Sequence, residues 1–76
     1  MNKMRRKTLQ VLYDIIAKAR DSLDEVRDEE DDYKENIPEN LQGSERYEKA
    51  EAAVDALEYA ISSLEEALDS IEEAMQ

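Results

Sequence analysis

The side chains with the greatest capacity for chemistry are carboxylates, and five of them are consecutive in the segment 28–32, DEEDD. Such a cluster could bind a divalent cation or a basic partner. Nucleophilic and general-base chemistry need other groups: the chain has neither histidine nor cysteine, so its serines have no imidazole or thiol beside them. It has no glycine-rich phosphate loop either. The composition therefore predicts a protein that is not an enzyme and uses no cofactor.

A cation site in the acidic segment is one alternative, with Glu30 and Asp31 as ligands beside a carboxylate from the second half of the chain. The pattern does not match known sites of this type. Di-iron helical bundles also use histidine, and an EF-hand loop needs a central glycine where this chain has Tyr33. We expect no metal, and we interpret Glu30 as a carboxylate near a helix end that is exposed or paired with Lys34 or Lys49.

Charge is the strongest compositional feature of the chain. The formal net charge is −11 over 76 residues, but residues 1–20 have a net charge of +5 and residues 51–76 a net charge of −8. An acidic surface repels nucleic acids and anionic membranes, so we expect neither as a partner. The surface either keeps a small helical protein soluble or binds a basic protein. For the second role the candidate residues are Asp28, Glu29, Asp31 and Asp32.

The segment 3–7, KMRRK, is the cationic cluster of the chain. It could contact phosphate, but positive charges at a helix N-terminus are unfavourable by themselves. We expect them to neutralise the acidic end of a neighbouring helix. Asp14 and Lys18 interrupt the apolar stretch that follows, so no signal peptide is expected, and no segment approaches the ~20 apolar residues of a membrane span.

Two long segments with heptad periodicity must position these charges. Apolar residues recur at alternating spacings of three and four, as in helices that pack in pairs. The inner positions of the first segment are Leu9, Leu12, Ile16, Ala19, Leu23, Val26, Glu30, Tyr33 and Ile37. Those of the second are Tyr47, Ala50, Val54, Leu57, Ile61, Leu64, Leu68, Ile71 and Met75. The pattern predicts one all-α domain, residues 1–76, with helices at about 3–36 and 45–75 and a connector at about 37–44.

An antiparallel hairpin brings the two sets of inner positions together in one register, in which Leu12 lies opposite Leu68. The same register places basic residues on one flank of the first helix beside glutamates of the second. The expected pairs are Arg27 with Glu51, Arg20 with Glu58 and Arg6 with Glu72. Exposed ion pairs contribute little stability, so we expect them to select the orientation of the helices.

The opposite flank carries small and apolar residues and predicts self-association. An apolar stripe of three positions per heptad is wider than a two-helix contact needs, and it is typical of a helix in a bundle. We therefore expect the hairpin to form a homodimer, a four-helix bundle. The face expected to mediate it consists of Ile15, Ser22, Ala53, Ala60, Ala67 and Ala74. The alternative is that the alanines only raise helix propensity.

The connector consists of Pro38, Glu39, Asn40, Leu41, Gln42, Gly43 and Ser44. Pro38 disfavours helical geometry at Ile37 and so ends the first helix. Gly43 is expected to adopt a positive φ, and Ser44 to cap the second helix. Glu39, Asn40 and Gln42 have no assigned role in the turn.

The four tyrosines are expected in three environments. Tyr33 and Tyr47 lie opposite each other in the predicted register, and Leu41 is expected to fold over them and close the core. Tyr13 is expected to cover an edge of the core. Tyr59 is expected to be exposed.

The connector also carries a resemblance. The segment 38–46, PENLQGSER, followed by the Ala-, Leu-, Glu- and Ile-rich second helix, resembles a group of small acidic proteins encoded in Gram-positive bacteria and their phages or mobile elements. No function is assigned to that group. The resemblance implies a bacterial or phage-associated cytoplasmic protein, and it carries no catalytic residue to this chain.

These observations predict a small cytoplasmic protein without enzymatic activity that acts through self-association and contacts with another protein. The alternative is an acidic decoy from a phage or mobile element. Such a decoy would imitate nucleic acid and inhibit a nucleic-acid-binding protein of the host.

Overall fold

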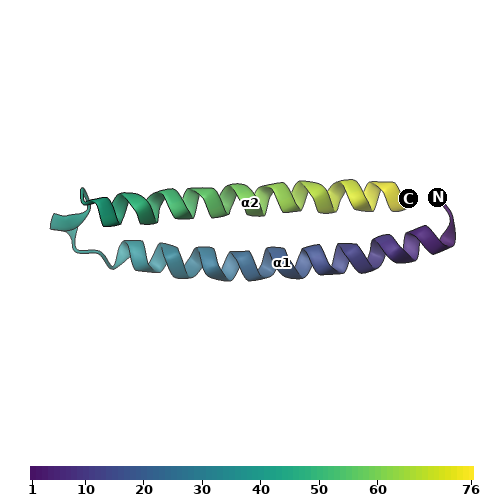
Figure 1. Cartoon of the computed structure of the whole chain (residues 1–76), viewed down its shortest axis with the longest axis horizontal. Helices are drawn as coiled ribbons and strands as arrows, with labels where there is room; N and C mark the ends of the chain where they lie inside the picture. Colours follow the sequence, from purple (N-terminus) through teal and green to yellow (C-terminus); the bar gives the residue numbers. More distant parts are fainter.

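The computed structural model describes residues 1–76 as two long helices joined by a short connector. Helix α1 spans Lys3–Glu35 and helix α2 spans Glu45–Met75. They run antiparallel and side by side, so that both chain termini lie at one end and the connector at the other (Figure 1). The molecule is a rod of 59 × 14 × 13 Å without strands, and the predicted antiparallel helical hairpin is confirmed.

Side-chain caps fix the start of each helix. The amide N–H of Arg5 donates to Oδ1 of Asn2 at 2.8 Å, and that of Tyr47 donates to Oγ of Ser44 at 3.3 Å. Each bond satisfies one of the amide groups that the first helical turn leaves without a partner. The predicted cap at Ser44 is thus confirmed.

A 3₁₀ turn explains the polar connector residues. Helix α1 ends at Glu35, two residues before the position that Pro38 restricts. The segment Glu39–Leu41 then forms one turn of 3₁₀-helix, in which the Leu41 N–H donates to the Pro38 carbonyl at 2.8 Å. Gln42 follows with an N–H donated to the Glu39 carbonyl at 3.3 Å. Glu39, Asn40 and Gln42, which had no expected role, therefore form this turn.

Two expectations for the connector were wrong. Gly43 does not have a positive φ, because the 3₁₀ turn reverses the chain with ordinary backbone angles. Leu41 does not close the core: it is 45% exposed, whereas Ile37 is 3% exposed. Ile37 follows the last helical turn directly, so the chain turns it inward before Leu41 reaches the corner.

The core of the hairpin belongs mainly to α2. The buried residues are Ile37, Ala50, Val54, Ile61 and Leu68. All the inner positions predicted for α2 are buried or half-buried. No residue of α1 is buried to the same degree.

Helix α1 is rotated about its axis relative to the prediction. The expected inner positions Leu9, Ile16, Leu23 and Glu30 are half-buried. The residues half-buried beside them are Tyr13, Arg20, Arg27 and Lys34, which the prediction placed on the flank of the helix. Of the other expected inner positions, Leu12, Ala19, Val26 and Tyr33 are exposed, whereas Ile37, which follows the helix, is buried. The aliphatic stems of arginine and lysine can cover apolar surface while their charged ends stay solvated. These stems take the place beside α2 that the prediction gave to the apolar side chains.

Candidate interaction surface

The rotation of α1 leaves an apolar surface without a partner, which we call the α1 stripe. Its residues are Met4, Val11, Leu12, Ile15, Val26 and Tyr33, all of them exposed. Ile15 is 59% exposed and Val26 is 48% exposed. At 100° per residue these side chains share one side of the helix and follow it for most of its length. A row of large exposed apolar side chains of this kind is a candidate interaction surface.

The surface area of the whole chain is large for its mass. The molecule exposes 5736 Å², whereas a compact monomer of its 8.8 kDa mass exposes about 4,800 Å². The excess of roughly 900 Å² arises because each helix of the rod has only one neighbour. One partner in a stable protein complex buries about 800 Å².

The residues predicted to mediate self-association have different environments. Ile15 and Ser22 are exposed on α1, and Ala74 is exposed near the end of α2. Ala53, Ala60 and Ala67 are half-buried on α2, on the flank of its buried inner positions. Sequence reasoning missed the rest of the α1 stripe. It assigned Leu12, Val26 and Tyr33 to the inner seam, although their heptad positions were also compatible with an outward apolar face.

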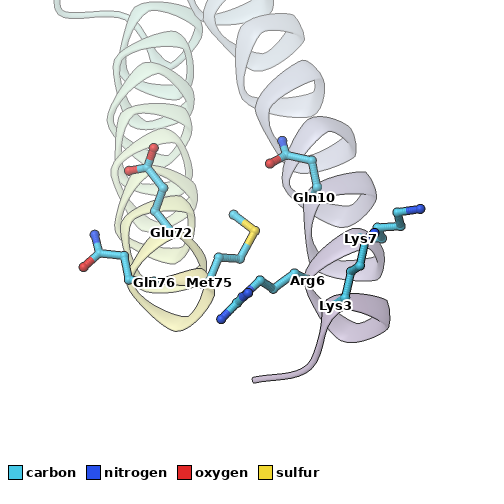
Figure 2. A pocket seen from close by; sticks show the side chains of 7 residues that line it. All are labelled: Lys3, Arg6, Lys7, Gln10, Glu72, Met75 and Gln76. Atoms are coloured by element: carbon cyan, nitrogen blue, oxygen red, sulfur yellow. The ribbon is translucent and has the colours of Figure 1, made fainter.

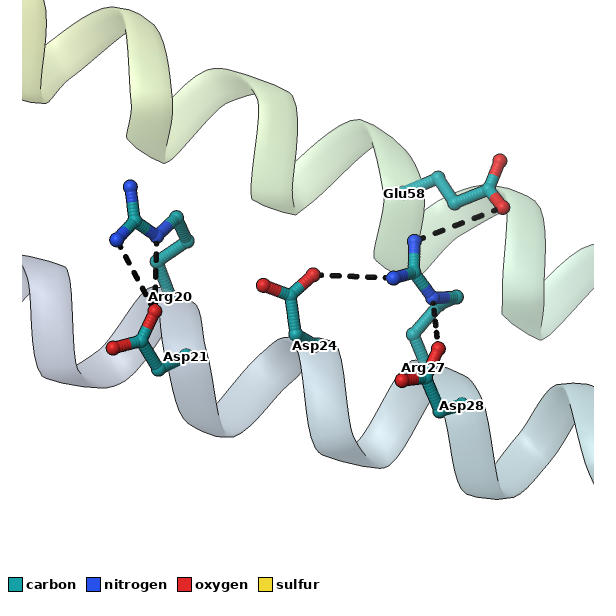
Figure 3. A network of polar contacts seen from close by, with 6 residues as sticks. All are labelled: Arg20, Asp21, Asp24, Arg27, Asp28 and Glu58. Carbon is teal, nitrogen blue, oxygen red and sulfur yellow. Dashed lines mark hydrogen bonds and ion pairs between the residues drawn. The ribbon is translucent and has the colours of Figure 1, made fainter.

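Ion pairs hold Arg20 and Arg27 mostly within their own helix (Figure 3). Arg20 pairs with Asp21 at 3.1 Å. Arg27 pairs with Asp24 at 3.2 Å and with Asp28 at 2.9 Å. A pair of Arg27 with Glu58 at 3.9 Å is the only one that joins α1 to α2.

The predicted pairs between the helices were therefore wrong. None of the three expected pairs, Arg27–Glu51, Arg20–Glu58 and Arg6–Glu72, is present. Aspartates lie one or three residues from Arg20 and Arg27 in the same helix, so the guanidinium groups reach them before the glutamates of α2. The hydrogen bond with Asp28 raises the pKa of Arg27 above its ordinary value, and the charges of Asp24 and Glu58 act in the same direction.

The acidic segment near the connector is only partly neutralised. Lys34 pairs with Asp31 at 3.3 Å and with Glu35 at 3.9 Å, and the hydrogen bond with Asp31 raises the pKa of Lys34. Glu30 is half-buried and has no ion pair. Neither of its two expected partners is available: Lys34 pairs with Asp31 and Glu35, and Lys49 pairs with Glu45 at 3.1 Å. No three carboxylates of the chain converge on a point that could hold a metal ion.

The four residues predicted as an acidic partner surface divide into two pairs. Asp28 and Asp31 are engaged with Arg27 and Lys34, whereas Glu29 and Asp32 have no ion pair. More unpaired carboxylates lie on α2, which carries ten acidic and two basic side chains. Those of α2 without an ion pair are Glu48, Glu51, Asp55, Glu65, Glu66, Asp69, Glu72 and Glu73. The larger acidic surface is thus on the second helix.

The open end of the hairpin holds the N-terminal cations. A shallow hollow between the helix ends is lined by Lys3, Arg6, Lys7 and Gln10 of α1, by Glu72 and Met75 of α2, and by Gln76, which follows α2. Arg6 extends toward α2, whereas Lys7 points away from it (Figure 2). The basic segment therefore lies beside the acidic end of α2, as expected, although no ion pair connects the two.

The tyrosines agree with three of the four expectations. Tyr13 and Tyr47 are half-buried and Tyr59 is 77% exposed. Tyr33 is exposed instead of opposing Tyr47 in the core, because the rotation of α1 turns it outward. The guanidinium of Arg46 lies 5.6 Å from the centre of the Tyr33 ring, a distance typical of a cation–π contact.

Comparisons with known proteins return no relative. No protein-family model matches the sequence, and neither the curated proteins nor the solved structures include a significant match. Neither α1 nor α2 contains an apolar stretch long enough to cross a membrane.

Proposed function

We propose that the protein is a non-enzymatic interaction module in which two hairpins associate into a four-helix bundle. The observation that carries the proposal is the α1 stripe, whose large apolar side chains have no partner in a single chain. Burial of apolar surface is the main favourable term in protein association. A second copy of the chain is the occupant that we propose for this surface.

Two quantities support self-association. A single hairpin buries only five residues, which is little for a domain of 76 residues, and small helical domains commonly gain stability by oligomerisation. The roughly 900 Å² of excess surface is also close to the area that one partner in a stable complex buries. The α1 stripe supplies the large side chains of the face, and the half-buried alanines of α2 would allow a close approach of the helices.

The mass of the protein in solution tests the proposal. Sedimentation equilibrium should give about twice the 8.8 kDa of one chain. Ile15→Glu places a charge in the middle of the α1 stripe, and it should weaken association at least about 100-fold because an unpaired carboxylate is costly to bury. Circular dichroism should still show the helices, because Ile15 is exposed in the single hairpin.

Tyr59→Glu provides the matched control. Tyr59 is a large exposed side chain that belongs to α2 and lies outside the α1 stripe. We expect this variant to remain a dimer. A wild-type protein that is folded and strictly monomeric at high micromolar concentration would refute the proposed bundle, and equal effects of the two substitutions would refute its location.

The acidic outer surface of α2 favours a second candidate function, that of an acidic decoy for a basic, nucleic-acid-binding protein. Eight carboxylates of this helix have no ion pair, and the helix has a net charge of −8. Carboxylates along a rod attract a surface that normally binds phosphates. The origin from a phage or mobile element belongs to this hypothesis and rests on the resemblance of the connector.

Competition for DNA tests the second candidate. The protein should displace a fluorescent DNA duplex from a basic, sequence-independent DNA-binding protein, and the displacement should weaken as salt rises. Neutralising Glu65, Glu66 and Asp69 as amides should reduce it more than neutralising Asp28 and Asp31, which already have partners. Absence of displacement at low salt would rule out this function.

A further inference from the structure

The charges on either side of the α1 stripe determine how two copies would be oriented. We infer that the copies pack with their α1 helices antiparallel, so that the N-terminal end of each stripe lies against the connector end of the other. This inference rests on the proposed dimer and adds the orientation of the partner copy.

Two clusters of charge on α1 have no partner within the chain. At the N-terminal end, Lys3, Arg5, Arg6 and Lys7 form no ion pair. At the connector end, Glu29, Glu30 and Asp32 form none either. Opposite charges at the two ends of one helix are complementary only when the second copy runs in the opposite direction.

The position of these charges around the helix makes the argument sharper. At 100° per residue, Arg5 and Glu30 lie on the flank of the α1 stripe nearer to α2, and Lys7 and Glu29 lie on the far flank. Antiparallel helices bring like flanks together. The second copy then places Glu30 beside Arg5 and Glu29 beside Lys7, and one register satisfies both pairs.

A parallel arrangement gives the opposite result. Parallel helices bring unlike flanks together, as e and g positions do in parallel coiled coils. Arg5 would then face Lys7 of the second copy, and Glu29 would face Glu30. Both contacts are repulsive, so the charges favour the antiparallel dimer at both ends.

The antiparallel register also assigns a role to Glu30. Its carboxylate is half-buried in the single chain and finds no cation there. In the dimer, Arg5 of the second copy approaches it at the edge of the contact between the α1 helices. The same register places Thr8 of one copy near Val26 of the other, and at 100° per residue both lie on the side of α1 that carries the stripe.

Cysteine cross-linking of the full chain tests the orientation, since the natural sequence has no cysteine. Thr8→Cys and Val26→Cys would be prepared as separate variants, mixed, and treated with a short bismaleimide. In the antiparallel dimer the mixture should give a mixed cross-linked product. Each variant alone should give almost none, because two identical positions would lie about 25–30 Å apart at ~1.5 Å per residue.

Ala19→Cys separates failure of the inference from failure of the dimer. This residue lies near the middle of the α1 stripe and should cross-link with itself in either orientation. Strong self-linking of Thr8→Cys and of Val26→Cys, without a mixed product, would overturn the antiparallel arrangement while the dimer stands. No cross-linking of any variant, including Ala19→Cys, would overturn the dimer and the orientation with it.

Discussion

The substitution Gly43→Ala tests how the connector reverses the chain. Gly43 has no positive φ, and a Cβ atom placed on it would have no heavy atom within 4 Å apart from those of Gly43 and its two chain neighbours. Alanine therefore fits the native backbone without strain or steric contact. Its effect on the folded state should be small, and the unfolded chain should lose conformational freedom.

The expected result is an increase in the free energy of unfolding of about 0.4–1 kcal/mol. Urea unfolding with a slope of about 1 kcal/mol/M would show this as a rise of the midpoint by about 0.4–1 M. The measurement is made at one protein concentration for all variants, because association adds to apparent stability. Gln42→Ala is the matched control: it changes a neighbouring residue of ordinary backbone geometry, and it should leave the free energy of unfolding within about 0.5 kcal/mol of the wild type.

A decrease of about 1–2 kcal/mol for Gly43→Ala would contradict the structure of the connector. That penalty is what a Cβ atom causes at a position with left-handed backbone angles. The sequence alone favoured this outcome, since a lone glycine between two helices is commonly such a position. The sign of one substitution thus distinguishes a 3₁₀ turn from a left-handed turn.

Three further predictions concern the ends of the helices and the core. Ser44→Ala should lower the free energy of unfolding by about 1 kcal/mol in urea unfolding, because it removes the cap of α2. Ile37→Ala should cost about 2–4 kcal/mol in the same assay, whereas Leu41→Ala should cost less than about 1 kcal/mol, because only the first side chain is buried. Hydrogen bonding to Asp31 raises the pKa of Lys34 from its ordinary 10.5, so the stability from this contact is complete below pH 10.5 and is lost as pH rises through the higher, folded-state value. Between pH 9 and 12 the wild type should therefore lose more stability than Lys34→Met, and equal losses would show that the contact contributes nothing.

The sequence was sufficient to predict α2 and the hairpin. All nine inner positions of α2 are buried or half-buried, because its apolar and acidic residues occupy separate sides of the helix and allow one orientation only. The cap at Ser44 and the end of α1 before Pro38 follow from local backbone chemistry, which does not depend on packing. Features of this kind are readable from a single sequence.

The orientation of α1 was not predictable in the same way. Its apolar residues occupy more than one side of the helix, and its arginines and lysines have stems that can also cover apolar surface. Two rotations of α1 about its axis therefore bury similar amounts of apolar surface against α2, and the heptad pattern does not distinguish them. Local ion pairs such as Arg27–Asp28 at 2.9 Å are satisfied in the observed rotation without help from α2. Three residues of the α1 stripe, Leu12, Val26 and Tyr33, were consequently assigned to the core.

The difference between the two helices supports the proposed assembly. Helix α2 has one side of large apolar residues, which faces α1, half-buried alanines beside it, and carboxylates on its outer side. Helix α1 has apolar side chains on the side facing α2 and again along the α1 stripe, a distribution typical of a helix between two neighbours. Its unpaired charges lie at both ends of the α1 stripe, where a second copy of α1 would meet them. The α1 helices would then supply the large side chains of the contact between the copies, and the acidic sides of α2 would remain outside for a further, basic partner.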